Sequence, residues 1–251
     1  MLFLKKLFFA GSLLCLAAGV AFAGSTQVDV TYLLHNTGSA GTSAFGLPDP
    51  NWTLITPGDP VQPPAYRATA YPTFNTAPAY VTNLSSGQFP AQYWLGETGS
   101  DTSTWISPCP SYPGLGSDAE SASFDFQTTF DLTGYSPDSA ALSFKFVTDN
   151  SLTEVLINGV PVAFAPGTGL MAWSGSSAIS GSGLLTGGLF TGGLNTLDFI
   201  VQNDAGLTGN PTGLRVEFAG QASATPEPGS LAMLGSGILL FGGLLRRKFA
   251  R

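Results

Sequence analysis

Four tryptophans are the residues in this chain best suited to binding chemistry: Trp52, Trp94, Trp105 and Trp173. A flat indole face can stack on the apolar face of a sugar ring, while neighbouring polar groups bond its hydroxyls. Candidates for that second role are Asn51, Gln92, Asp101 and Asn150. We predict that at least one of the four tryptophans lines a carbohydrate site. The alternative is that all four are core or loop anchors, as large aromatic residues usually are.

Two aspartates in a proline-rich stretch could hold a metal ion. Asp49 and Asp59 could ligate a structural Ca²⁺, since hard cations choose carboxylates and loop carbonyls. No ligand spacing here is diagnostic of a metal. We therefore predict no metal site and no cofactor beyond that optional ion.

Residues with catalytic potential are few. A single histidine, His35, excludes most zinc enzymes. Cys109 is the one cysteine left once a signal peptide is removed, so it has no intrachain disulfide partner. A polymer hydrolase would need two carboxylates in a cleft. Asp125 and Asp131 share strand parity but are expected to face solvent, so no catalytic residue is predicted and the chain is expected not to be an enzyme.

The charges are distributed unevenly along the 251 residues. Charged residues make up 10% of the chain, and the formal net charge is −7. All sixteen acids lie between the two hydrophobic ends, with only three basic residues: Arg67, Lys145 and Arg215. A body this acidic repels nucleic acid and anionic lipid, so a nucleic-acid binder is excluded.

The first 23 residues are typical of a secretory signal peptide. Lys5 and Lys6 precede an apolar run, and Ala21 and Ala23 supply the small residues that signal peptidase requires. Cleavage would leave Gly24 as the first residue of the mature chain. The alternative is an uncleaved membrane helix. Signal peptidase and the secretion translocon are therefore expected partners.

The C-terminal end has three parts in a fixed order. Pro226, Glu227 and Pro228 precede an apolar run over residues 231–245, and Arg246, Arg247 and Lys248 follow it. Fifteen residues make a helix about 22 Å long, which is short against a hydrocarbon core of about 30 Å. The basic residues hold that end in the cytoplasm. Both ends of the chain thus predict a body outside the membrane and a basic stub, residues 246–251, inside.

This tail resembles the PEP-CTERM protein-sorting signal over residues 224–251. The resemblance implies processing near Pro-Glu-Pro by an exosortase, a membrane-embedded cysteine peptidase. It also implies transient anchoring, followed by delivery to the cell surface or extracellular matrix of an exopolysaccharide-making bacterium. Some ice-binding proteins carry the same tail. The alternative is a plain C-terminal anchor.

Between the two ends, hydrophobic residues alternate with polar ones. Residues 124–132, 142–147, 197–202 and 214–218 each place an apolar set on one face. A period of two indicates antiparallel strands that cover a core. Asn158-Gly159 predicts a tight primed hairpin turn between residues 154–157 and 160–164. Proline-rich residues 48–64 and glycine-rich residues 166–193 are expected as long loops or edge connections.

The second half of the body resembles the galactose-binding-like jelly roll. The resemblance rests on residues 124–132, 147–150, 155–159 and 190–201, and it implies a fold rather than a function. We expect an all-β, antiparallel jelly-roll-like β-sandwich over residues 24–221. A signal helix over residues 1–23 would precede it; a tether over residues 222–230 and a transmembrane helix over residues 231–245 would follow it.

Together these features favour a non-catalytic exported protein that associates with exopolysaccharide or biofilm material. One alternative is a secreted polysaccharide hydrolase. Another is an ice- or surface-binding adhesion module, which would need a flat, threonine-rich face.

Overall fold

The chain is described here from a computed structural model. The structure describes residues 26–39, 45–55, 76–82, 94, 102–108, 122–166, 178–204 and 212–225, and, in the tail, residues 235, 237, 238, 242 and 246. The predicted signal peptide lies outside the described residues. So do the Pro226–Pro228 motif, Arg247, Lys248 and most of the predicted apolar helix. Arg246 is described as an exposed helical residue. None of the helices within the described residues has the length and apolar character that a membrane span needs.

The described body is all-β. Its strands are β1 (Gln27–Asp29), β2 (Pro48–Ile55), β3 (Thr76–Val81), β4 (Ile106–Ser107), β5 (Ala122–Asp131), β6 (Tyr135–Asp149), β7 (Ser151–Ile157), β8 (Val160–Pro161), β9 (Phe164–Pro166), β10 (Ala178–Thr186), β11 (Leu194–Asn203) and β12 (Gly213–Ala224). A 3-10 helix, η1 (Thr31–Leu33), follows β1.

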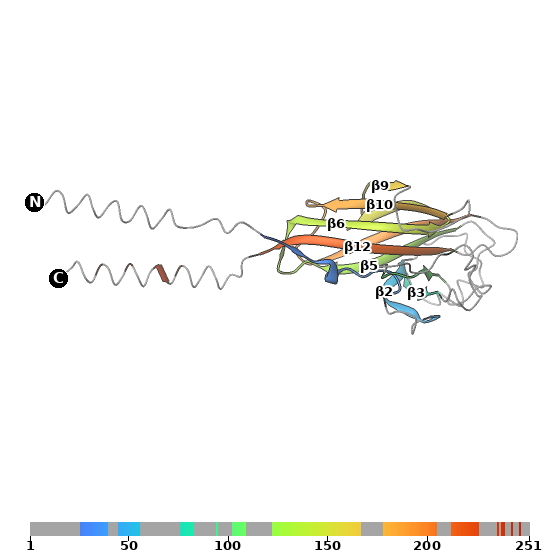
Figure 1. Cartoon of the computed structure of the whole chain (residues 1–251), viewed down its shortest axis with the longest axis horizontal. Coiled ribbons are helices and arrows are strands. Elements are labelled where there is room, and N and C mark those ends of the chain that lie inside the picture. The colour runs from blue at the N-terminus through green and yellow to red at the C-terminus, as the bar shows by residue number, and fades with distance from the viewer. Residues whose placement is uncertain are drawn as a thin grey trace, which may run out of the picture.

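All strand pairs are antiparallel and belong to one curled sheet. The order of neighbours is β8-β7-β11-β5-β2-β3-β4-β12-β6-β10-β9, and β1 pairs with β12. The two ends of this path, β8 and β9, are consecutive in the chain. Each of these short edge strands contains a proline, Pro161 or Pro166. Proline removes a ladder donor and so protects an edge against pairing with another chain. Figure 1 shows the long strands β5, β6, β10 and β12 running along the body.

The curl brings the inner faces of the sheet together over one core. Phe144 of β6 meets Phe199 of β11 edge to face, with ring centroids 5.3 Å apart. Phe218 of β12 lies 6.2 Å from the same Phe199 ring. The alternating residues predicted for β5, β6, β11 and β12 are buried in this core. The period-two prediction and the all-antiparallel assignment are thus confirmed.

The predicted Asn158-Gly159 turn is also confirmed. It joins β7 to β8, and both residues have positive φ, 50° and 77°, as a primed turn requires. The Asn158 side chain then donates to Asn195 Oδ1 at 2.9 Å, while its own Oδ1 accepts the Thr196 N–H at 3.0 Å. The turn is thereby tied to the start of β11.

Two stretches expected as loops contain strands. Residues 48–55 form β2, and residues 178–186 form β10. In β10, Gly181 and Gly183 lie against the rings of Phe146 and Phe144, where any Cβ would overlap the ring. Because these glycines have no side chain, they leave room for the large aromatic rings of the neighbouring strand β6. They do not interrupt the hydrogen-bonded pairing of the two strands. Composition alone therefore misassigned this segment.

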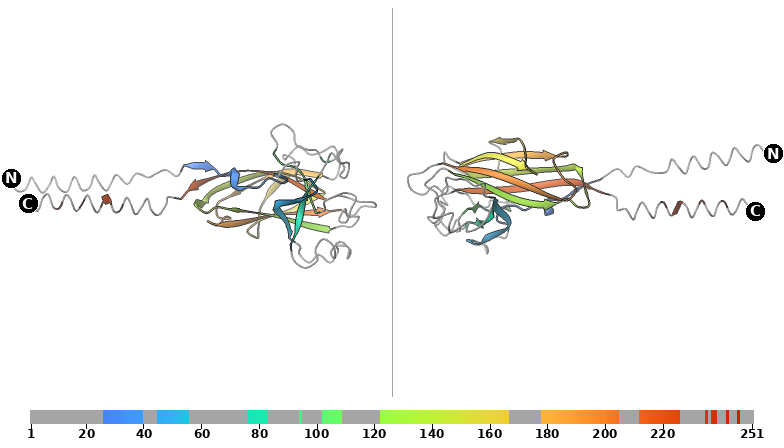
Figure 2. Two further views of the ribbon diagram at one scale, coloured as in Figure 1. Left: turned by 90° about the horizontal axis from the view of Figure 1, so that it is seen from below. Right: turned by 180° about the vertical axis from the view of Figure 1, so that it is seen from behind.

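The last strand extends further than expected. The sequence predicts a tether that begins at residue 222, yet Ala222, Ser223 and Ala224 are the last three residues of β12. Ala222 and Ser223 pair with Val28 and Gln27 of β1 and are buried. Figure 2 shows β1 beside the end of β12. The N-terminal and C-terminal ends of the folded body therefore leave it at the same place.

Candidate functional site

Trp52 is a core residue. Its indole is fully buried, stacks near Phe218 at a centroid distance of 6.3 Å, and lies 5.9 Å from Phe199. Its Nε1 donates to the backbone carbonyl of His35 at 3.0 Å. Trp52 thus fastens the segment after η1 to the core.

Trp94 and Trp105 form a second buried pair. Their rings stack with centroids 4.5 Å apart and an interplanar angle of 14°. Trp94 also lies over Gly213, where an added Cβ would be 2.6 Å from its Cη2. Its Nε1 donates to Asp149 Oδ2 at 2.7 Å.

None of these three indoles presents a face to solvent in the structure. A sugar ring needs an open face on which to stack, so the predicted carbohydrate role gains no support from Trp52, Trp94 or Trp105. Trp173 lies outside the described residues.

Asp149 is the buried acid at this site. Burial raises its pKa to about 6; the hydrogen bond from Trp94 opposes that rise, and the charge of Asp204 adds to it. Asn150 lies beside it, and its Oδ1 accepts the backbone N–H of Asp204 at 2.8 Å. Asn150 is buried as well, so its predicted role toward sugar hydroxyls finds no open surface.

Side-chain oxygens from the N-terminal segment complete the edge of β12. The backbone N–H groups of Val216, Phe218 and Gly220 point away from β6. They donate to Thr37 Oγ1, Asn36 Oδ1 and Thr31 Oγ1 at 2.9, 2.9 and 3.0 Å, respectively. Buried backbone donors must be satisfied, and here three side chains replace a neighbouring strand.

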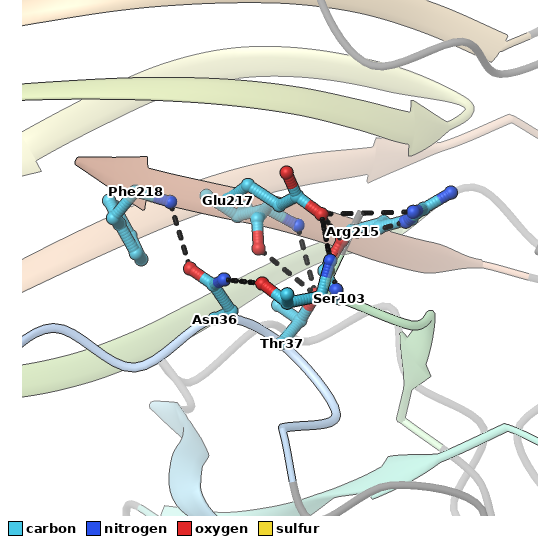
Figure 3. A network of polar contacts seen from close by, with 8 residues as sticks. Asn36, Thr37, Ser103, Arg215, Glu217 and Phe218 are labelled. Atoms are coloured by element: carbon cyan, nitrogen blue, oxygen red, sulfur yellow. Dashed lines mark hydrogen bonds and ion pairs between the residues drawn. The ribbon is translucent and has the colours of Figure 1, made fainter. Parts of the chain in front are cut away.

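A buried arginine lies next to this edge, on the outer face of β12 (Figure 3). Arg215 is 0% exposed, and its Nε donates to Ser103 Oγ at 2.8 Å. Glu217 Oε1 accepts from Ser103 Oγ at 2.9 Å and from the Thr102 and Ser103 N–H groups at 2.7 and 3.1 Å. Arg215 Nη2 lies 3.9 Å from the same oxygen. The network holds residues 102–103 on β12. It buries Arg215 and partly covers Glu217, two polar residues that alternate with core residues along this strand.

The acids proposed for Ca²⁺ or catalysis are placed as follows. Both oxygens of Asp49 accept backbone N–H groups, from Gly38 at 2.7 Å and Asn51 at 2.9 Å, and burial raises its pKa. Asp59 lies outside the described residues. Within the described ranges, no group of three or more His, Cys, Asp or Glu side chains could hold a metal ion.

Asp125 and Asp131 do not form a pair. They lie six residues apart on β5, which separates them by about 20 Å, and Asp131 bonds to its own neighbour Thr133. The carboxyl groups that act on Asp125 come from the neighbouring strands β11 and β7. Burial, with the charges of Asp198 and Glu154, raises the pKa of Asp125 to about 7. Asp198 accepts from Gln127 Nε2 at 2.7 Å, and burial raises its pKa as well.

An open groove lies on the outer face of the sheet beside β1. Its volume is about 350 Å³, at the lower end of the range that holds small ligands. Polar groups come from Asp29, Thr31, Ser143 and Gln221, and a small apolar floor comes from Ala141, Ala219 and Gly220 with exposed Leu184. Hydrogen bonds from the Thr31 side chain and backbone lower the pKa of Asp29, so its carboxylate is ionised near neutrality. We call this site the β1 groove; residue spacing along the sequence did not reveal it.

The ice-binding alternative requires a flat, threonine-rich face. Among the described strands, cross-strand register brings together one threonine pair, Thr129 of β5 with Thr196 of β11.

His35 contributes its backbone carbonyl to Trp52, while Cys109 and Asp101 lie outside the described residues.

Comparison with known proteins identifies the tail. Residues 224–248 match the family described as the PEP-CTERM protein-sorting motif. This motif implies an exported protein that an exosortase sorts to the cell surface. A search of curated proteins found no match.

A solved β-glucosidase from Kluyveromyces marxianus is similar over 79% of this chain, at 13% identity and a TM-score of 0.29. The matched region is 22% of that enzyme, so this chain spans about a fifth of its length. A likeness of that size carries no argument about this chain.

Proposed function

We propose that the sorted protein is non-catalytic and associates with exopolysaccharide at the cell surface or in the biofilm matrix. In this proposal the body is a galactose-binding-like jelly roll. After transient anchoring through the C-terminal apolar helix, an exosortase releases it.

The β1 groove is the observation that carries the binding role. Its hydroxyl, amide and carboxylate groups surround a small apolar floor, and this mixture suits a sugar unit with free hydroxyls. The Asp29 carboxylate can accept two hydroxyl donors but repels an acidic sugar. A neutral glycan segment is therefore the expected ligand.

The experiment uses the released protein purified from the culture. Its retention on the host's own exopolysaccharide is compared with that of Asp29→Asn and Leu184→Ala, and the control is Thr153→Ala, which changes an exposed residue of β7. We expect the two groove variants to bind about tenfold more weakly, which corresponds to about 1.4 kcal/mol. Equal retention of all four proteins would leave the groove without a binding role.

A hydrolase acting on extracellular polymer is the second candidate, and one observation favours it. Burial and the charge of Asp198 raise the pKa of Asp125 to about 7, and a carboxyl group that keeps its proton near neutrality can act as a general acid. Product release from exopolysaccharide, abolished by Asp125→Asn, would replace the non-catalytic proposal. If the unmodified protein releases no product from exopolysaccharide, the non-catalytic proposal is supported.

A further inference from the structure

Folded structure continues almost to the sorting motif. Ala224 of β12 pairs with Tyr135 of β6, and the Thr225 N–H donates to the Gly134 carbonyl at 2.9 Å. Pro226, the first residue of the motif, comes next in the chain. The described fold therefore reaches the residue that immediately precedes the segment that the peptidase must bind.

The end of β12 is held on both sides. Ser223 pairs with Gln27 of β1, and its N–H donates to Ser139 Oγ at 2.8 Å. Ala222 and Ser223 are 0% and 2% exposed. Lengthening the connection by peeling this strand would break those bonds and expose its buried side chains.

Chain length then limits how far the body can lie from its processing enzyme. Pro228 lies three positions after Thr225, a span of at most about 11 Å. Leu231, where the apolar run begins, lies six positions after Thr225, a span of at most about 22 Å. Only the end of the body at which β12 finishes can therefore face the enzyme.

We call this end the tail-end face, formed by the exposed parts of residues 27–32, 131–139, 186–194 and 221–225. Tyr32 is 67% exposed, and its hydroxyl pairs with that of Tyr135 at 2.5 Å. Since Tyr135 lies opposite Ala224 in the sheet, this tyrosine pair marks the point at which the chain leaves the body.

The charge of the tail-end face favours a protein partner over a lipid surface. These segments contain Asp29, Asp131 and Asp138 and no lysine or arginine. Anionic headgroups attract basic segments and repel acidic ones. A tyrosine-centred acidic surface fits a protein surface with basic and hydrogen-bonding groups.

We propose that the tail-end face, centred on Tyr32 and Tyr135, is the surface that docks on the outer side of the exosortase while the motif is bound. This inference rests on the sorting function. It adds two points to that function: the tail-end face is the part of the body that contacts the exosortase, and the body stays folded while the enzyme processes the tail.

The test places a photo-reactive benzophenone amino acid at position 32 of the full-length chain in its own cells. The exosortase carries a substitution of its catalytic cysteine, so that the complex accumulates. The same probe at Asp204 is the matched control. Asp204 is exposed and follows β11 at the opposite end of the body, about 33 Å along the strand from Leu194, which lies at the tail-end face. Thermal melting checks that both variants fold.

We expect the position-32 probe to give about tenfold more adduct with the exosortase than the position-204 probe, as a high local concentration requires. A Gly/Ser insert of about twelve residues between Thr225 and Pro226 adds about 20 Å of mean reach. It should lower the position-32 adduct to the control level while processing by active exosortase continues.

Equal adducts from the two positions, adducts with lipid alone, or a position-32 adduct unaffected by the insert would overturn the docking proposal. Alanine replacement of Pro226, Glu227 and Pro228 separates this failure from a failure of sorting. If that replacement leaves release unchanged, the sorting function itself is wrong. If release requires the motif but position 32 gives no excess adduct, only the docking surface is wrong.

Discussion

The indole N–H of Trp94 donates to Asp149 Oδ2 at 2.7 Å, and this bond joins an aromatic residue to a carboxyl group in the interior of the body. The same indole stacks on Trp105 and covers Gly213. A residue whose type suits sugar binding thus has each of its two faces and its one donor occupied inside the protein.

Replacing Trp94 with Phe should raise the pKa of Asp149 above its value of about 6. The Trp94 N–H favours the ionised carboxylate, so its loss leaves burial and the Asp204 charge less opposed. Carbon-13 NMR titration of the aspartate carboxyls measures this. Trp105→Phe disturbs the stacked pair but keeps the hydrogen bond, so an equal shift in both variants would contradict the assignment.

Replacing Gly213 with Ala should destabilise the protein by about 1–3 kcal/mol, as overpacking does. The new Cβ would lie 2.6 Å from Trp94 Cη2, so the ring would have to shift and its stacking on Trp105 would be disturbed. Thermal unfolding and near-ultraviolet circular dichroism report the two effects. Gly193→Ala is the control, since a Cβ there meets nothing within 4 Å; similar losses in the two variants would argue against a specific Trp94 contact.

Replacing Glu217 with Ala should lower the free energy of unfolding by about 2–3 kcal/mol. The change removes the acceptor for three hydrogen bonds from residues 102–103 and a carboxylate oxygen that lies 3.9 Å from Nη2 of buried Arg215. Glu217→Gln keeps a carbonyl acceptor and loses only the charge. Its free energy of unfolding, measured with urea, should therefore lie between those of the unmodified protein and the Ala variant. A Gln variant as unstable as the Ala variant would mean that charge, and not hydrogen bonding, dominates this network.

Replacing Asp125 with Asn should stabilise the protein at pH 8 and leave it unchanged at pH 4. The native state holds the Asp125 proton up to a pKa of about 7, whereas an unfolded carboxyl releases it near 3.8. Native stability from this group is therefore complete below the unfolded pKa and is lost as pH rises through about 7. The gain at pH 8 should be about 1–2 kcal/mol after solvent screening of a partly exposed group is allowed for.

Asp131→Asn provides a control of opposite sign for the same unfolding experiment. Hydrogen bonds from the Thr133 side chain and backbone lower the pKa of Asp131. Its contribution is present above the unfolded pKa and lost at lower pH. This exposed variant should therefore lose a little stability at pH 8; a gain in both variants would point to net charge as the common cause.

Three features could be predicted from the sequence itself: the strands with alternating hydrophobic residues, one hairpin turn, and the sorting motif of the tail. Phe124, Phe144 and Phe199 face the core because the side-chain period of a strand is two, whatever the strand pairs with. Asn158-Gly159 specifies its turn through backbone conformations that other residues rarely adopt. The tail is recognised because its three parts are contiguous. Each of these signals is local, so no knowledge of distant residues is needed.

Only the tertiary structure decided which outward-facing residues are covered. Arg215 alternates with core residues and looks solvated, yet residues 36–37 and 102–103, more than a hundred positions away, bond to that strand. Gly181 and Gly183 look like loop residues until the rings of Phe146 and Phe144 lie against them. The pairing of β1 with the end of β12 is equally non-local and joins residues 27 and 223. Burial of an outer face depends on which distant segment packs there, and the periodicity of a single strand contains no information about that segment.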